Sequence, residues 1–173
     1  MAAPGYVANN LMGGTQQSIS TAITSATGTV LRLMTPAATS KRFYLTELDF
    51  GQSGPPNPTD CSVQWTLQQC DATGAGTPGA TVVAQPTSGY VTASNLDLAV
   101  TLAKVNYTAA PTTYLTVATF YAKAINQRGA GFWQAAPGGE IYFPILVNTG
   151  PGLTAYSATY ASTVIGRVMF SEI

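Results

Sequence analysis

The stretch CSVQWTLQQC, residues 61–70, decides the fold because apolar and polar side chains alternate along most of its length. Val63, Trp65 and Leu67 fall on one side, and the intervening Gln and Thr residues fall on the other. Successive side chains of a β-strand point to opposite faces of its sheet. The alternation therefore predicts a strand whose Val63, Trp65 and Leu67 are buried and whose polar residues face outward.

Cys61 and Cys70 stand at the two ends of this stretch. Along a strand this separation places them on opposite faces and about 30 Å apart, which is beyond the reach of a disulfide. Cys61 falls in phase with the buried residues and is expected to be a small core side chain. Cys70 falls in phase with the polar residues and is expected on the outer face.

Short β-like runs recur on both sides of this strand, separated by clusters of Gly, Pro, Asn and Ser. They cover residues 29–36, 42–50, 81–85, 91–102, 112–121, 130–135, 140–148 and 162–170. No convincing helical period competes with them. The pattern predicts an all-β fold, a jelly-roll-like sandwich of about eight core strands with short edge pieces.

The run at residues 42–50 changes phase in its middle. Leu45 belongs to the apolar face of its first half, whereas Leu48 belongs to the opposite face. One extra residue in a strand reverses the facing of the residues that follow it. A β-bulge is therefore predicted near Thr46 and Glu47.

The segment Ala136–Gly139 has the signature of a type II turn, because proline at its second position fixes φ and glycine at its third accepts a positive φ. The runs at 130–135 and 140–148 are therefore expected to form a hairpin around it. The aromatic residues of this hairpin are expected to alternate between the interior and the outer face, with most of them in the core. They are Phe132, Trp133, Tyr142 and Phe143.

The composition favours one domain with a covered surface. The 173 residues suffice for a two-layer core. Charged residues make up only 8% and their net charge is zero, while 25 Thr residues supply polarity. This balance leaves no electrostatic footprint for nucleic acid or an anionic membrane, and suggests a surface covered by other copies or by a partner. A monomer with a Thr, Ser, Gln and Asn surface is the alternative.

Neither a signal peptide nor an apolar run long enough to cross a bilayer is apparent, so synthesis in a cytosol without export is expected. Asn106 begins a glycosylation sequon, which we interpret as chance in such a protein.

Residues 1–26 carry no charge and show no period, so they are expected to form an extended N-terminal arm before a sandwich domain at 27–173. In one interpretation the arm lies across a neighbouring subunit, and in the other it is a mobile terminus. The apolar residues expected to make the contact are Tyr6, Val7, Leu11 and Met12.

The sequence argues against an enzyme. It contains no His, which excludes Ser-His-Asp and Cys-His nucleophilic systems and removes the commonest metal ligand. Glu47 and Asp49 have the spacing that puts two carboxylates on one face, but a contact to Lys41 or Arg42 is favoured over glycosidase chemistry. Cys70 has no basic partner nearby in sequence. No cofactor and no metal site are expected.

Three stretches together resemble a pattern in small structural proteins of tailed-phage virions. They are NQRGAGFWQAAPGGEIYFP (126–144), VNTGPGL (147–153) and VIGRVMFSE (164–172), with weaker support from 42–54 and 62–70. Gly129 and Gly131 depart from the pattern, where larger residues are expected. The resemblance implies a jelly-roll-like sandwich that trimerises or coats a shell, and it implies no active site.

The expected function is that of a capsid cement or decoration protein on the virion surface. Its expected partners are the major capsid protein and its own copies in a homotrimer. A receptor- or glycan-binding module of a head fibre or tail is the alternative. A jelly-roll main capsid protein ranks third. The side chains that could stack on sugars in the binding module are Trp133, Tyr142, Tyr156 and Tyr160.

Overall fold

The computed structural model describes residues 5–13, 17–19, 29–33, 43–70, 77–82, 85–86, 103–109, 114–143, 150–159 and 161–172. Within these ranges the regular structure is β-strand, apart from one 3₁₀ turn, η1 (Asn10–Gly13). The strands are β1 (Gly5–Asn9), β2 (Gln17–Ile19), β3 (Thr29–Leu33), β4 (Phe43–Gln52), β5 (Ser62–Cys70), β6 (Thr77–Val82), β7 (Gln85–Pro86), β8 (Ala103–Ala109), β9 (Tyr114–Asn126), β10 (Ala130–Gln134), β11 (Ile141–Phe143), β12 (Gly150–Tyr156) and β13 (Ser162–Glu172).

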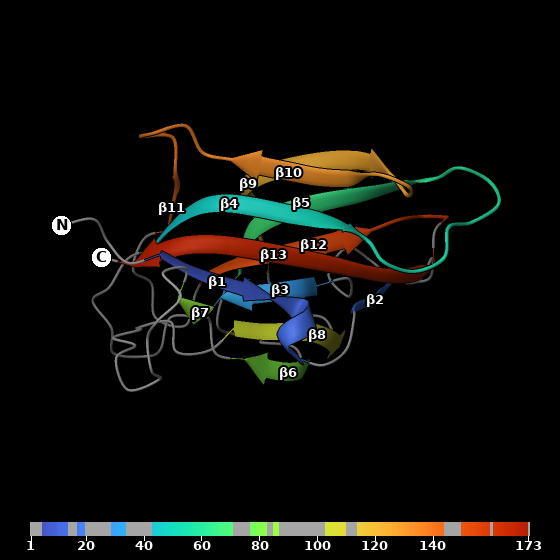
Figure 1. Ribbon diagram of the computed structural model, residues 1–173, viewed down its shortest axis with the longest axis horizontal. Helices are drawn as coiled ribbons and strands as arrows, with labels where there is room; N and C mark the ends of the chain where they lie inside the picture. Colours follow the sequence, from blue (N-terminus) through green and yellow to red (C-terminus); the bar gives the residue numbers. More distant parts are fainter. Residues whose placement is uncertain are drawn as a thin grey trace.

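Two antiparallel sheets form the fold (Figure 1). The first sheet has the order β10-β4-β13-β1-β7, with β11 also on β4 and β2 also on β13. The second has the order β6-β8-β3-β12-β5-β9. The prediction of an all-β sandwich is confirmed. The jelly-roll connectivity and the count of about eight core strands stay predictions.

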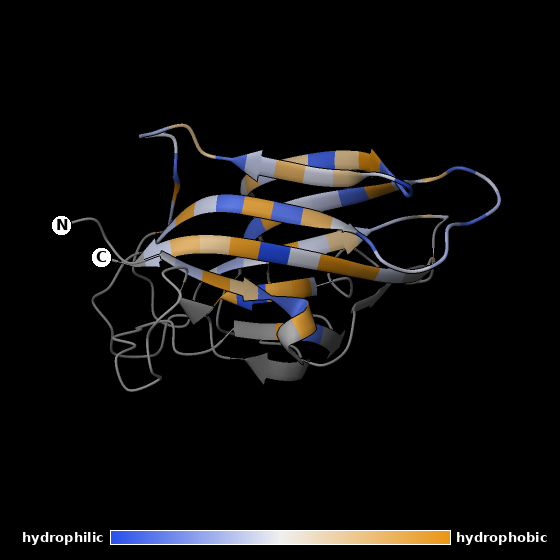
Figure 2. Cartoon of the chain, viewed as in Figure 1, coloured by the Kyte–Doolittle hydropathy of each residue, from blue (hydrophilic) through white to orange (hydrophobic). Residues whose placement is uncertain are grey.

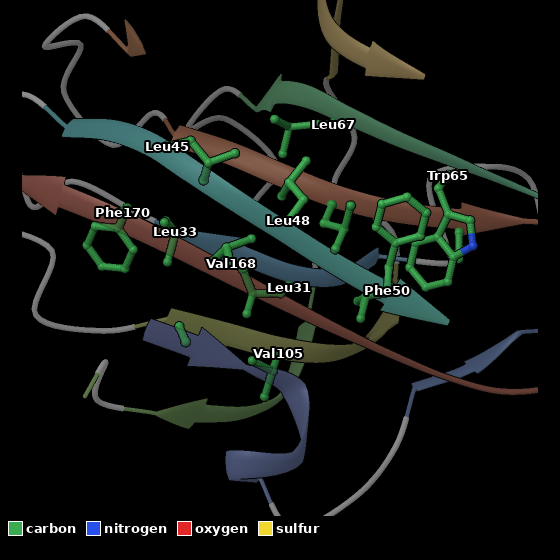
Figure 3. Packing of buried hydrophobic residues seen from close by; sticks show 14 of the residues in the cluster. Leu31, Leu33, Leu45, Leu48, Phe50, Trp65, Leu67, Val105, Val168 and Phe170 are labelled. Carbon is green, nitrogen blue, oxygen red and sulfur yellow. The ribbon is translucent and has the colours of Figure 1, made fainter. Parts of the chain in front are cut away.

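The core lies between the sheets and takes alternate residues from the central strands. Val63, Trp65 and Leu67 are fully buried, as the alternation predicts. In β13 the buried positions include Val168 and Phe170, again two residues apart. Figure 3 shows side chains of β4, β5 and β13 meeting between the layers, and Figure 2 shows the matching stripes of hydropathy along β4 and β13.

The β-bulge predicted near Thr46 and Glu47 is confirmed. Glu47 is opposite Met169 on β13, but the next pair joins Leu45 to Phe170, so Thr46 is the extra residue. Its hydroxyl donates to the carbonyl of Met169 at 3.2 Å. The bulge allows both Leu45 and Leu48 to reach the core despite their odd spacing.

The type II turn at Ala136–Gly139 is also confirmed, but the hairpin around it is wrong. Gly138 has a φ of 83°, and the amide of Gly139 donates to the carbonyl of Ala136 at 2.8 Å. However, β10 and β11 do not pair with each other. Both pair antiparallel with β4, one after the other. The turn therefore belongs to a loop that leaves one interrupted edge strand and returns to it.

The predicted N-terminal arm is largely part of the sandwich in the described residues. β1 lies between β13 and β7, and β2 pairs with the start of β13. Tyr6 is 4% exposed and its ring lies 5.7 Å from that of Phe170. The physical reason is that alternate residues of β1 bury Tyr6 and Ala8 in the core of the same chain. Residues 1–4, 14–16 and 20–26 lie outside the described ranges.

Hydrogen bonds from Asn10 tie this segment to the sandwich. Its side-chain amide donates to the carbonyl of Val164 and to Oδ1 of Asn106, both at 3.0 Å. Its Oδ1 accepts from the amide of Gly166, and its carbonyl accepts from the side chain of Asn106, also at 3.0 Å. Asn10 and Asn106 are both buried, so these hydrogen bonds lie inside the fold.

One central strand was not expected from the sequence. β12 contains Gly150, Pro151 and Gly152, which have the composition of a turn, yet it pairs with β5 along its full length. The register with β3 begins only at Gly152, so proline at 151 lies where the ladder on that side has ended. The expected strand at 91–102 lies outside the described residues, as does the side chain of Cys70.

Candidate interaction surface

The side of the first sheet that faces away from the core, here called the outer face, carries its side chains in rows set by the strand register. One row crosses β10, β4, β13 and β1, and the next lies two residues further along each strand. The first row is Phe132, Asp49, Arg167 and Asn9, and the second is Gln134, Glu47, Met169 and Val7.

An ion-paired group lies at the centre of the outer face. Nη2 of Arg167 lies 2.5 Å from Oε1 of Glu47 and 3.4 Å from Oδ2 of Asp49. Glu47 and Asp49 do share a face, as their spacing predicts. Their cationic partner is Arg167 on the neighbouring strand, while Lys41 and Arg42 lie outside the described residues. One guanidinium thus bridges both carboxylates.

Large apolar side chains surround this group. Phe132 is 55% exposed and Tyr142 is 36% exposed, and both follow the outward phase of their strands. The ring of Tyr142 lies 5.2 Å from that of Tyr44. Leu11, in η1, is 48% exposed. The outer face therefore offers apolar and aromatic contacts around charges that are already paired.

A surface hollow of about 400 Å³ opens at the end of this sheet where β4 finishes and β10 begins. The hollow forms because small residues on β4, on β10 and in the turn before β10 leave space beneath longer side chains. Among the lining residues the small ones are Gly51, Gly129 and Ala130, and the longer ones include Leu11, Arg128 and Arg167.

The turn that carries the chain from β9 to β10 fixes one wall of the hollow. The side chain of Gln127 is buried, accepts from the amide of Asn57 at 2.7 Å, and donates to the carbonyls of Asn57 and Thr59. Arg128 pairs with Asp60 through Nε at 3.0 Å. This hydrogen bond from Arg128 holds the pKa of the Asp60 carboxyl below its usual value of 3.8. Gln127 and Arg128 thus fix the position of the 53–60 loop, which extends at the right of Figure 1.

No protein-family model, no curated protein and no solved structure matches this chain.

The structure places the four residues proposed for the arm contact in different environments. Tyr6 belongs to the core, so its assignment to an intermolecular contact is wrong for this structure. Val7 is half-buried on the outer face, and Leu11 is exposed at the hollow. The side chain of Met12 lies outside the described ones. Of the four residues, only Val7 and Leu11 are placed on the candidate interaction surface.

The aromatic residues around the turn divide evenly between core and surface. Phe143 is 1% exposed, and Trp133 packs against the core beside Tyr121, with ring centroids 6.3 Å apart. Phe132 and Tyr142 lie outside. The expectation that most of them belong to the core was thus wrong for Phe132 and Tyr142, because both occupy the outward phase of an edge strand.

In the part of the chain that the structure describes, no group of three or more His, Cys, Asp or Glu residues could hold a metal ion. No helix in the same part is long and apolar enough to cross a membrane.

Proposed function

We propose that this protein is a structural component of a phage virion, a capsid cement or decoration protein that binds the major capsid protein and stabilises the shell. In this proposal it is a homotrimer with a jelly-roll-like sandwich, acts without catalysis or cofactor, and is made in the host cytoplasm before it joins the capsid surface.

The observation that carries the proposal is the outer face of the first sheet. Exposed Phe132, Tyr142 and Leu11 surround charges that are paired within the chain. Exposed apolar patches on a soluble domain mark contact sites, and aromatic residues are enriched in protein interfaces. The low charge of the chain and the resemblance of residues 126–172 to virion proteins support a large protein assembly as the partner.

The test is binding to phage heads assembled without this protein. Co-sedimentation should show saturable binding. Heads that carry the protein should also withstand higher temperatures than bare heads. Phe132→Ala should weaken binding about tenfold or more, as loss of an aromatic interface anchor does. Binding should change little between about 50 and 500 mM salt, because screening acts on unpaired exposed charges.

Phe120→Ala is the control on β9 of the second sheet, where Phe120 is 37% exposed, and its melting temperature is measured first because its ring also packs 4.7 Å from that of Phe143. Equal loss of binding in both variants would place the contact elsewhere. Absence of any binding by the intact protein would overturn the proposed function.

A glycan-binding module is the second candidate, and Tyr142 is the residue that favours it. Its ring is exposed and stacks near Tyr44 on an open face. Trp133 packs inward, Tyr156 is half-buried, and Tyr160 lies outside the described residues. A glycan-array signal that Tyr142→Ala removes would support this candidate. The third candidate, a main capsid protein, requires a copy number equal to that of the most abundant virion protein.

A further inference from the structure

Six residues, Ala135–Glu140, leave the first sheet at a single point, and we name them the 135–140 loop. Gln134 of β10 is opposite Glu47, and Ile141 of β11 is opposite Leu45. Only the bulge residue Thr46 lies between these two partners on β4. The edge strand is therefore continuous along β4 except for a loop that projects from it, at the upper left of Figure 1.

The 135–140 loop has a defined conformation although it is exposed. The amide of Ala135 donates to the carbonyl of Thr46 at 2.9 Å, and the type II turn closes at 2.8 Å. The amide of Gly138 donates to Oε1 of Glu140 at 3.2 Å. Ala136, Pro137 and both glycines are exposed, and a Cβ on Gly138 would have no neighbour within 4 Å. A preformed projecting loop loses little entropy on binding.

The surface hollow lies toward the opposite end of the same sheet. Gly51, one of its lining residues, lies five residues along β4 from Thr46, which corresponds to about 16 Å. The loop extends away from it (Figure 1), so the loop of one molecule is not placed to fill its own hollow. A contact between the two features joins different molecules.

Charge and size favour such a contact. The loop is uncharged except for Glu140, and the wall of the hollow carries Arg128, whose side chain pairs with Asp60 through Nε but is still 53% exposed. The lining also holds the amide side chains of Asn9, Asn10 and Gln52 and the ion pair of Asp49 with Arg167, besides small and apolar residues such as Gly51, Ala130 and Ile165. The hollow of about 400 Å³ also falls in the range of pockets that enclose small groups.

We propose that the 135–140 loop of one copy docks into the surface hollow of a second copy, with Glu140 facing Arg128 of that copy. The two surfaces differ, so the contact is head-to-tail, and it closes into a ring when the rotation permits. The inference rests on the homotrimer included in the proposed function and assigns its interface.

Sedimentation equilibrium of the full-length protein tests the inference. The intact chain should form a closed trimer, and Ala130→Leu, which fills the hollow from an exposed position, should weaken association at least tenfold. Ala130→Ser is the matched control that leaves the hollow open. Both variants should melt like the intact protein, because Ala130 is exposed.

A double-mutant cycle tests the specific pair. Glu140→Ala and Arg128→Ala should each weaken association, and the double variant should be no weaker than the worse single one, as for residues that contact each other. Additive losses would remove the pair from the interface.

The outcomes separate this inference from the proposed function. The docking contact is overturned if the protein stays monomeric, or if Ala130→Leu leaves the trimer unchanged. Head binding can succeed in either case. Trimers that dissociate with Ala130→Leu but never bind heads would keep the contact and overturn the cement function.

Discussion

At the scale of single residues, the core explains why position 131 holds glycine. The resemblance to virion proteins predicts a larger residue there. Gly131 lies on the inner side of β10, and a Cβ built there would overlap the ring of Phe50. That ring packs 4.8 Å from the ring of Trp65, where Figure 3 shows both in the core. A larger residue at 131 would have to displace two packed aromatic side chains.

Gly131→Ala should therefore lower the free energy of unfolding by roughly 1–3 kcal/mol, which corresponds to a melting temperature lower by about 3–10 °C. Gly51→Ala is the matched control on the facing strand, because its Cβ would meet its nearest neighbour at 3.6 Å. Differential scanning calorimetry compares them. Equal melting temperatures for the two variants would contradict this account of Phe50 packing.

The Asp60 carboxyl gives a pH prediction at the same scale. Its pKa is lowered chiefly by the hydrogen bond from Arg128. A lowered folded-state pKa means that the pair stabilises the fold above the ordinary Asp pKa, and that this contribution is lost as pH falls through the lowered value. Carboxyl ¹³C NMR titration should find the Asp60 pKa below 3.8 and nearer that value in Arg128→Ala. An unchanged pKa in the variant would refute the assignment.

At the scale of elements, β9 ends the second sheet, and β5 is its partner in the described part of the chain. Lys123 is opposite Trp65 and lies between Tyr121 and Ile125, both of which pack on the core. A lysine in the inward phase of an edge strand discourages pairing with another chain, because the added strand would bury its charge.

Lys123→Thr should accordingly increase self-association of the folded protein, measured by light scattering during incubation below the melting temperature. The conservative variant Lys123→Arg keeps the charge and should behave like the intact chain. Aggregation that is the same in all three proteins would show that β9 is protected by something other than Lys123.

At the scale of the whole molecule, the N-terminal segment completes the sandwich rather than preceding it. β1 lies between β13 and β7, and Asn10 hydrogen-bonds β8 and β13 together. Tyr6 fills part of the core. Removing this segment would expose an edge of β13 and leave buried polar groups of Asn106 and Gly166 without their Asn10 partner.

Deletion of residues 2–13 should cost more than about 4 kcal/mol or abolish cooperative unfolding, since it removes core packing and a buried hydrogen-bond network together. Thermal unfolding followed by circular dichroism measures this. Leu11→Ala, at an exposed position of the same segment, should melt within about 2 °C of the intact protein. A truncated protein with an unchanged melting temperature would restore the view of this segment as a free arm.

Local features of this fold could be predicted because their causes act within a few residues. Period-two alternation placed Val63, Trp65 and Leu67 in the core, and a change of phase located the bulge at Thr46. The chemistry of Pro137 and Gly138 specified a type II turn. The spacing of Glu47 and Asp49 likewise predicted their shared face.

The sequence by itself thus determined strands such as β5 and β13, the residues that they bury and the local turn, through backbone sterics and side-chain alternation. Only the tertiary structure decided which strands pair: β1 joins β13, β10 and β11 both join β4, and β12 becomes a central strand. It also decided that Arg167 meets Glu47, 120 positions away in the chain. The physical reason is that ladder hydrogen bonds join backbone groups common to all residues, so register is selected by packing of the complete core.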